Sequence, residues 1–255
     1  TPNVALMYKP GKFNFRASYA AGFRTPTLSE LYATDIAKKN DRLTIGNLDL
    51  KPEKNNYFSL SAEYVHERFS VSVNAFYNNI RDMIDYNTIA TGDKAMEQYG
   101  HKEVRQRDNI AEAKVHGINV SANAYLGAGF NLSGGYTHLN TQDVELEQPI
   151  DKSIKNAYNI NAQWAHSWKI YRLNINLNGR INSKRFSKSY GYAPEYQLWD
   201  LNTRHSFNLK SVIIEPGFGM ENLFDYMDDR PYNSNYATLT PGRSFYISLS
   251  LKFKS

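Results

Sequence analysis

The chain has 255 residues, a formal net charge of +5 and no cysteine, which excludes a disulfide scaffold and a thiolate metal site. It contains no run of about 18 apolar residues, so we expect no transmembrane helix. A pI near 9.1 would suit nucleic acid, but the cations form no basic helix or stripe, so no nucleic-acid partner is expected.

Apolar and polar residues alternate with a period of two along most of the chain, which predicts about eleven β-strands. In chain order, the expected strands are Asn3–Tyr8, Phe13–Gly22, Tyr57–Glu67, Phe69–Asp85, Val115–Leu126, Phe130–Leu139, Tyr158–Trp164, Tyr171–Ile181, Tyr196–Phe207, Val212–Phe224 and Arg243–Phe253. The last of them is long enough to cross a bilayer as a tilted strand.

Short and long connections alternate strictly between these strands. Pro10–Lys12 and Gly127–Gly129 are short turns, whereas the long loops are expected at 23–55, 86–108, 140–155, 182–194 and 225–241. In outer-membrane barrels, short turns are periplasmic and long loops are extracellular. Within the first loop, residues 27–37 predict a short helix with Thr27 as N-cap and Glu30 three residues later.

The expected fold is all-β: an antiparallel transmembrane β-barrel in which residues 1–255 supply about 11 C-terminal strands of a barrel of about 22 strands. The strand tally is odd, whereas single-chain bacterial barrels are typically even, so we expect the other strands outside this chain. The alternative is a soluble β-sandwich. Sandwiches rarely place Asn at every second position of paired strands, as at Asn174, Asn176 and Asn178.

Three stretches resemble the signature boxes of TonB-dependent outer-membrane receptors. Residues 21–32 (AGFRTPTLSELY) resemble the Gly-Phe-Arg-Ala-Pro box, and residues 46–53 (GNLDLKPE) resemble the Gly-Asn-Pro-Asp-Leu-Lys-Pro-Glu box, with Leu48 where proline is usual. Residues 220–225 (MENLFD) are similar to the signature of the penultimate strand. The matching residues of the first two boxes are Phe23, Arg24, Pro26, Asn47, Asp49, Leu50 and Pro52.

The resemblance implies a protein of the bacterial cell outer membrane that takes up a scarce, large nutrient with energy from the inner-membrane TonB complex. The leading ligands are an iron chelate such as a siderophore, haem, or cobalamin, and no resident cofactor is implied. The implied partners are the remainder of the barrel, a plug domain that couples to TonB and lies outside this sequence, and outer-membrane lipid. Whether a surface lipoprotein also binds stays open.

Aromatic and cationic residues cluster in the expected outer loops. Aromatic rings offer flat apolar faces and cations attract an acidic chelate. The ligand-binding candidates are Tyr99, His101, Arg105, His138, Tyr190, Tyr192, Tyr232 and Tyr236. Solvated loops or contacts to lipopolysaccharide phosphates are the alternative. Haem-importing members carry a His between the first two boxes, and residues 27–45 contain none, which weakens the haem hypothesis.

Arg24 is expected to pair with Asp49 or Glu53, so that both boxes shape the outer loop; contact between the boxes and ligand is the alternative. The chain has no Gly-x-Ser-x-Gly, His-Glu-x-x-His or phosphate-loop motif. We therefore expect no enzyme, no catalytic residue and no metal ligand. The rivals to active uptake are a passive porin-like channel, an outer-membrane hydrolase and a surface adhesion barrel.

Overall fold

The computed structural model describes residues 1–187, 191–228 and 241–254. Eleven antiparallel strands form one continuous path of hydrogen-bonded neighbours, which confirms the predicted number. In the order of that path they are β1 (Asn3–Tyr8), β2 (Phe13–Arg24), β5 (Glu53–Val65), β6 (Phe69–Thr91), β7 (Glu103–Gly127), β8 (Phe130–Asp143), β9 (Asn156–Trp168), β10 (Tyr171–Asn182), β13 (Tyr196–Asn208), β14 (Val212–Glu221) and β15 (Ser244–Phe253). Within the described ranges, no helix is long and apolar enough to span a membrane.

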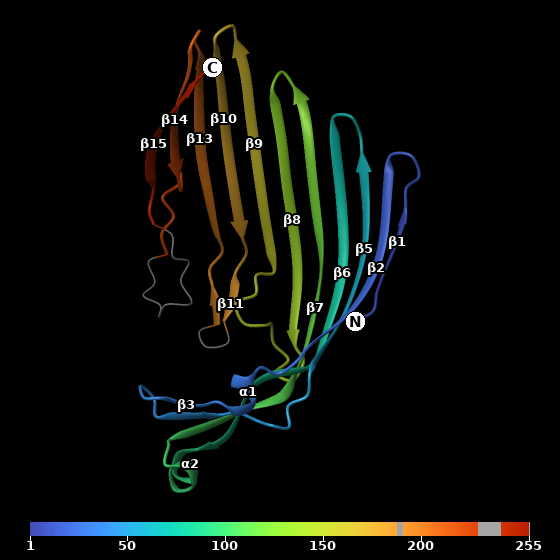
Figure 1. The fold of residues 1–255 in the computed structure, drawn as a ribbon, viewed down its shortest axis with the longest axis vertical. Coiled ribbons are helices and arrows are strands. Elements are labelled where there is room, and N and C mark those ends of the chain that lie inside the picture. Colours follow the sequence, from blue (N-terminus) through green and yellow to red (C-terminus); the bar gives the residue numbers. More distant parts are fainter. Residues whose placement is uncertain (188–190, 229–240, 255) are drawn as a thin grey trace.

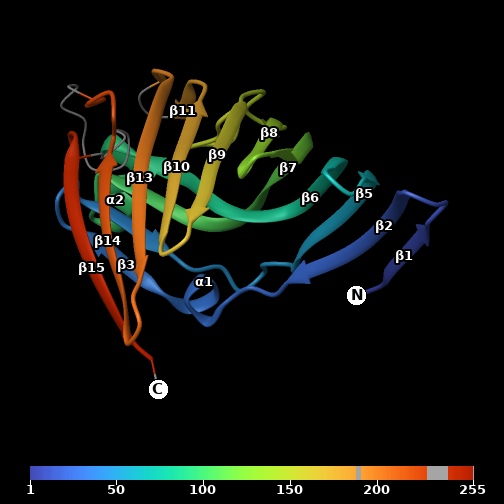
Figure 2. The same cartoon turned by 90° about the horizontal axis from the view of Figure 1, so that it is seen from above.

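Short and long connections lie at opposite ends of the strands, as predicted (Figure 1). We call these the turn end and the loop end. The loop end carries α1 (Leu28–Tyr32), β3 (Thr34–Ala37), β4 (Arg42–Ile45), α2 (Gly92–Tyr99), β11 (Arg185–Ser187) and β12 (Gly191–Ala193). Viewed from above, the sheet is curved rather than flat, and α1 and β3 lie across its open side (Figure 2).

The expectation of a loop at 86–108 is wrong over about half of its length. β6 continues to Thr91 and β7 begins at Glu103, so only α2 and residues 100–102 lie outside strands. The pairing of β6 with β7 shifts register between Ile80 and Met83 and again between Thr88 and Ala90. Such bulges let a strand pair continue while they interrupt the period of two that sequence analysis relies on.

The helix expected at 27–37 begins where predicted but is shorter. Thr27 Oγ1 accepts a bond from the Glu30 amide at 3.2 Å, and the Glu30 carboxylate accepts one from the Thr27 amide at 2.8 Å, which completes a capping box. The helix ends at Tyr32 because Ala33 is extended and Thr34–Ala37 pair with β4.

Other strand ends differ from prediction by a few residues, mostly by extension at the loop end. β5 begins at Glu53 rather than Tyr57, and β8 reaches Asp143 rather than Leu139. β14 is shorter than expected and ends at Glu221. The reason is the next residue, Asn222, whose left-handed backbone (φ 52°) turns the chain out of the strand.

The register gives the sheet two chemically different faces. Asn176 lies opposite Asn202, whereas the adjacent Leu177 lies opposite Leu201. The polar face is the concave one, since Arg24 on the polar side of β2 bonds to α1 on the open side of the sheet. The apolar face is exposed, with Leu60, Ile247 and Leu249 each 65% or more accessible. We call the two faces the inner and the outer face.

Two aromatic belts border an aliphatic band on the outer face. Near the turn end, the ring centroids of Phe13 and Tyr64 lie 4.8 Å apart, and near the loop end those of Tyr19 and Phe58 lie 4.7 Å apart. On β6, the belts are marked by Phe69 and Tyr77. Their separation of eight residues corresponds to about 26 Å along the strand. The apolar band of outer-membrane barrels is about 25 Å tall.

Val73 lies midway between the belts on the outer face and is 40% exposed. Val73→Arg should therefore destabilise the membrane-inserted fold by about 2–4 kcal/mol, because a charge would face acyl chains at the bilayer midplane. The matched change Asn74→Arg, at the same depth on the inner face, should cost far less. Urea unfolding of the full-length protein in phospholipid bilayers would measure both. Equal destabilisation would contradict the assignment of the faces.

Candidate functional site

The inner face of β9 and β10 carries hydrogen-bonded rows of side-chain amides. Asn161 Nδ2 lies 2.6 Å from Asn176 Oδ1 and 2.6 Å from Asn178 Oδ1. Further along the sheet, the Tyr246 hydroxyl donates to Asn202 Oδ1. Amides and hydroxyls can both donate and accept hydrogen bonds, so this wall can act as donor or as acceptor toward water or a polar partner.

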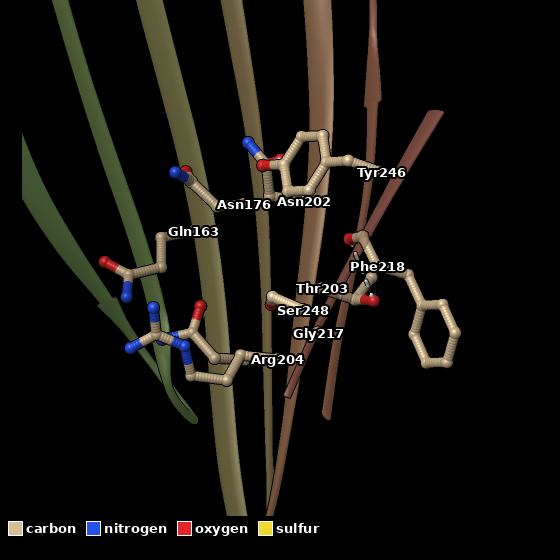
Figure 3. A pocket seen from close by; sticks show the side chains of 10 residues that line it. Gln163, Asn176, Asn202, Thr203, Arg204, Gly217, Phe218, Tyr246 and Ser248 are labelled. Carbon is tan, nitrogen blue, oxygen red and sulfur yellow. Dashed lines mark hydrogen bonds between the residues drawn. The ribbon is translucent and has the colours of Figure 1, made fainter. Parts of the chain in front are cut away.

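A polar hollow of about 390 Å³ lies on this face, at the strands β9, β10 and β13–β15 (Figure 3). The ring of Phe218 points away from the polar side chains, as its position on the outer face requires. Arg204 supplies a positive charge to the lining. The main polar lining residues are Gln163, Asn174, Asn176, Asn202, Arg204 and Tyr246.

Sequence analysis proposed none of these lining residues as ligand contacts. The period of two fixes their face, which is the signal that could have found them. The hollow itself also depends on small residues in β14. A Cβ atom on Gly217 would lie 2.6 Å from Ser248 Oγ, so a larger residue would occupy part of the space. That steric relation requires the register of β14 with β15.

Arg24 joins three segments at the loop end. Its Nη2 lies 2.6 Å from Glu53 Oε1 and its Nη1 lies 2.9 Å from Glu30 Oε2. Glu53 also accepts a bond from the Ile84 amide at 2.8 Å. The predicted pairing of Arg24 with Glu53 is confirmed. The other predicted partner, Asp49, is exposed, and Glu30 of α1 is the second partner instead.

Two long segments at the loop end fold together, and we call residues 34–45 and 92–106 the loop unit. β4 pairs in parallel with the start of β7, which sets Leu43 beside Val104. These two side chains and Ala95 of α2 form a small buried cluster. His101 Nδ1 lies 2.8 Å from Asp41 Oδ1, and this bond lowers the pKa of the Asp41 carboxyl.

Three of the predicted ligand residues belong to the loop unit. Tyr99 packs against the buried cluster, His101 bonds to Asp41, and Arg105 Nε donates to Glu103. The structure thus brings these three residues to one unit and gives each a partner within the chain. Their contact with ligand stays a prediction.

The other predicted ligand residues do not join this group. His138 shares the outer face with Tyr136, and its Nδ1 lies 2.8 Å from Asn156 Oδ1. Tyr192 of β12 is 58% exposed and its ring lies 5.3 Å from that of Phe186. Tyr190, Tyr232 and Tyr236 lie outside the described residues. Among the described residues, no group of three or more His, Asp or Glu could hold a metal ion.

The second sequence box wraps closely around α1. The Asn47 amide donates to the Glu30 carbonyl at 3.0 Å, and the Gly46 amide donates to the Ala33 carbonyl at 2.8 Å. A Cβ atom on Gly46 would lie 2.5 Å from the Leu31 carbonyl oxygen, so glycine is required there.

The end of the same box is fixed to β7. The Lys51 amide donates to Asn109 Oδ1 at 2.7 Å, and Asn109 Nδ2 donates back to the Lys51 carbonyl at 2.9 Å. Leu50 is buried, whereas Pro52 is exposed. In the first box, Phe23 is 62% exposed and Pro26 is half-buried. These bonds of the two boxes to other parts of the chain therefore shape the outer loop.

Arg24→Ala should loosen the segment 25–52 at its start, because Glu30 and Glu53 would lose their common cation while the pairing of β4 with β7 remains. We expect faster trypsin cleavage at Lys38 and Lys39 in the full-length protein. Arg16→Ala is the matched control, since the shortest distance from Arg16 to Glu63 is 4.0 Å. Cleavage at the wild-type rate in Arg24→Ala would show that Arg24 does not anchor the loop.

The Arg24 guanidinium, with a further bond from the Thr27 amide, lowers the pKa of Glu30 from 4.5 to about 2. A carboxyl with a lowered folded pKa stabilises the fold above its unfolded pKa and loses that contribution as the pH falls through the folded value. The anchoring by Glu30 should therefore be complete at pH 6 and disappear between about pH 4.5 and 2. Carboxyl NMR should give a Glu30 midpoint near 2; a midpoint near 4.5 would contradict the pairing.

The chain matches the family model of the TonB dependent receptor-like β-barrel over residues 1–223. A mutant of the ferric enterobactin receptor PfeA from Pseudomonas aeruginosa is similar over 99% of this chain and 39% of its own, with 20% identity and a TM-score of 0.75. The ferric preacinetobactin receptor BauA from Acinetobacter baumannii is 18% identical over 99% of this chain and 36% of its own, with a TM-score of 0.70. The copper transporter OprC is 13% identical over 97% and 38%, with a TM-score of 0.73.

At these identities the solved structures share the fold, and this chain spans less than two fifths of the length of each. The family match covers ten of the eleven strands of the sheet path, and the first two sequence boxes lie within it. This chain belongs to the TonB-dependent receptor β-barrel family.

Proposed function

We propose that this chain forms part of the wall and outer loops of a bacterial outer-membrane receptor that takes up a ferric siderophore or a similar iron chelate, driven by TonB. The observation that carries the proposal is the two-sided sheet: an aliphatic band between aromatic belts on one face and amide rows on the other. Such a sheet suits a wall between lipid and a wet passage. Family membership supports TonB-dependent uptake.

The amide rows suit a passage through which a polar solute moves. Each neutral hydrogen bond contributes only about 0.5–1.5 kcal/mol net, because it replaces a bond to water. A solute, or a plug domain within the barrel, can therefore exchange one amide for the next without being trapped. Arg204 adds attraction for an acidic chelate in the inner hollow.

The positions of the histidines favour a chelate over haem. His101 is bonded to Asp41, and His138 faces outward beside Tyr136. Neither is placed to bind an iron atom from the passage. A ferric siderophore needs no protein ligand, because its own oxygen atoms fill the coordination sphere of the iron. Receptors with the same fold include those named for ferric enterobactin and ferric preacinetobactin.

Uptake by cells tests this function. Cells that lack other iron receptors but express the full-length protein should accumulate iron-55 from ferric enterobactin or ferric preacinetobactin, and an uncoupler should abolish accumulation. Haemin and cyanocobalamin serve as competing probes. Accumulation of haemin or cyanocobalamin in place of the ferric chelates would contradict the proposal that the transported ligand is an iron chelate. Uptake that survives the uncoupler would indicate a passive channel.

Binding variants test the loop-end contacts. Arg105→Ala and Tyr192→Ala should each weaken binding of the transported chelate about tenfold, which corresponds to about 1.4 kcal/mol. Tyr8→Ala, an exposed tyrosine close to the turn end, is the matched control and should leave affinity unchanged. Tryptophan-fluorescence titration of the purified receptor would measure all three. Wild-type affinity in both loop-end variants would remove these residues from the binding site.

A further inference from the structure

Two glycines of the sheet lie beneath an aromatic ring of the neighbouring strand. A Cβ atom added to Gly179 of β10 would lie 2.5 Å from Cζ3 of Trp199, and one added to Gly219 of β14 would lie 2.1 Å from Cζ of Tyr246. Each glycine lies directly opposite the aromatic residue in the register. Both glycines are buried, so the ring fills the space that a side chain on the glycine would need.

The arrangement recurs along the sheet, always in the same kind of strand pair. At three more strand glycines, an added Cβ would lie 3.1 Å or less from the side chain directly opposite: Gly117 with Phe76, Gly135 with Asn159, and Gly217 with Ser248. We call these five residues the covered glycines. Their covering residues belong to the pairs β6–β7, β8–β9, β10–β13 and β14–β15, each of which is connected at the loop end.

Strand pairs connected at the loop end differ from hairpins in what sets their register. A short turn fixes the register of the hairpin that it closes, whereas a long loop leaves the register open. The alternation of apolar and polar residues excludes a slip by one residue, because every side chain would change face. A slip by two residues keeps every side chain on its face. The pairs with long loops therefore need another feature that excludes two-residue slips.

The covered glycine of β10 supplies this feature. The residues of β10 two positions away from Gly179, on the same face, are Leu177 and Ile181. A two-residue slip would set the ring of Trp199 opposite one or the other of these branched side chains. Neither leaves the space beneath the ring that glycine leaves, so both slips would overpack the wall.

The ring of Tyr246 is held at its far end as well. Its hydroxyl donates to Asn202 Oδ1 of β13, so the side chain crosses β14 at Gly219 and joins three strands (Figure 3). A two-residue slip of β15 would set the ring opposite Glu221 in one direction and opposite Gly217 in the other. In the second case the hydroxyl would lie two residues away from Asn202, and the bond would be lost.

We propose that the covered glycines set the register between successive hairpins of the wall, so that each hairpin joins the next in one alignment only. At the pair β2–β5, a Cβ on Gly22 would make only an ordinary contact, 3.9 Å from Asn55 Cβ. There Arg24 lies directly opposite Glu53 and bonds to it, which marks the register by charge. The proposal concerns assembly of the wall and is independent of the solute that the receptor takes up.

Disulfide trapping during refolding tests the proposal, in full-length protein without native cysteines. Leu177→Cys with Leu201→Cys reports the native register, because these positions lie opposite each other. Leu177→Cys with Thr203→Cys reports a two-residue slip, since diagonal positions are about 7–8 Å apart in the native register, too far for a disulfide. Trp199→Ala should raise the ratio of slipped to native disulfide about tenfold, because the overpacking that penalises the slip would be absent.

The pair β14–β15 provides an independent site for the same measurement. Met220→Cys with Phe245→Cys reports its native register, and Met220→Cys with Ile247→Cys reports the slip that sets residue 246 opposite Glu221. Tyr246→Ala should raise the slipped fraction here. Because the ratio is read during refolding, a variant that assembles only in part still yields it.

The matched control for trapping is Trp164→Ala, which removes an outer-face tryptophan that lies opposite Phe130 and Ile175 rather than a glycine. It should leave the ratio of slipped to native disulfide unchanged. A ratio at the wild-type level in both Trp199→Ala and Tyr246→Ala, or an equal rise in the control, would overturn the proposal.

Glycine substitution measures the same contact from the other strand. Gly179→Ala should speed unfolding of the full-length protein in bilayers about tenfold, because the new Cβ would overpack the ring of Trp199. In the Trp199→Ala background the same change should have no such effect. Gly134→Ala of β8 is the matched control, since its Cβ would meet only the Asn159 carbonyl oxygen at 3.4 Å. Equal acceleration by Gly179→Ala with and without Trp199 would contradict the proposal.

Discussion

The structure depends on the requirement that backbone amides and carbonyls inside a bilayer find partners within the protein. Long strands with unbroken antiparallel pairing meet that requirement, and the eleven-strand path is built from them. Once pairing is fixed, side chains must alternate between two sides. One side then meets acyl chains and the other meets water, so aliphatic residues and amides separate without any buried core between them.

The few buried apolar side chains of the described residues lie mostly toward the loop end, several of them in the loop-end parts of the strands. Leu43, Ala95 and Val104 form a small core where α2 and β4 meet β7. The segment 25–52, which contributes Leu43 to this core, is also held by charge, through Arg24 with Glu30 and Glu53. Both carboxylates are largely shielded from water, which strengthens their bonds to the guanidinium relative to those of a fully exposed pair. Hydrophobic burial thus joins the two long segments to each other, and ion pairing adds a second anchor to the first of them.

Much of the fold could be predicted from the sequence, because a period of two determines both the strands and their faces. The runs at Tyr171–Ile181 and Arg243–Phe253 are matched within one residue by β10 and β15. The capping box at Thr27 could also be predicted, because it depends only on residues three positions apart. The extension of β6 and β7 toward the loop end could not be predicted, because bulges near Met83 and Ala90 break the period of two. Contacts between distant segments, such as Leu43 with Val104, leave no local pattern, and so the loop unit and the inner hollow could not be predicted.

The parallel pairing of β4 with β7 has an evolutionary consequence. Leu43 reaches its cluster only if residues 42–45 keep their register with residues 103–106. An insertion of one residue in either segment would turn Leu43 toward solvent and Thr44 inward. The two surface segments therefore have to diverge together, as a single cassette. Exchange of one of them between related receptors would give a mismatched chimaera, whereas exchange of both would transfer an intact surface.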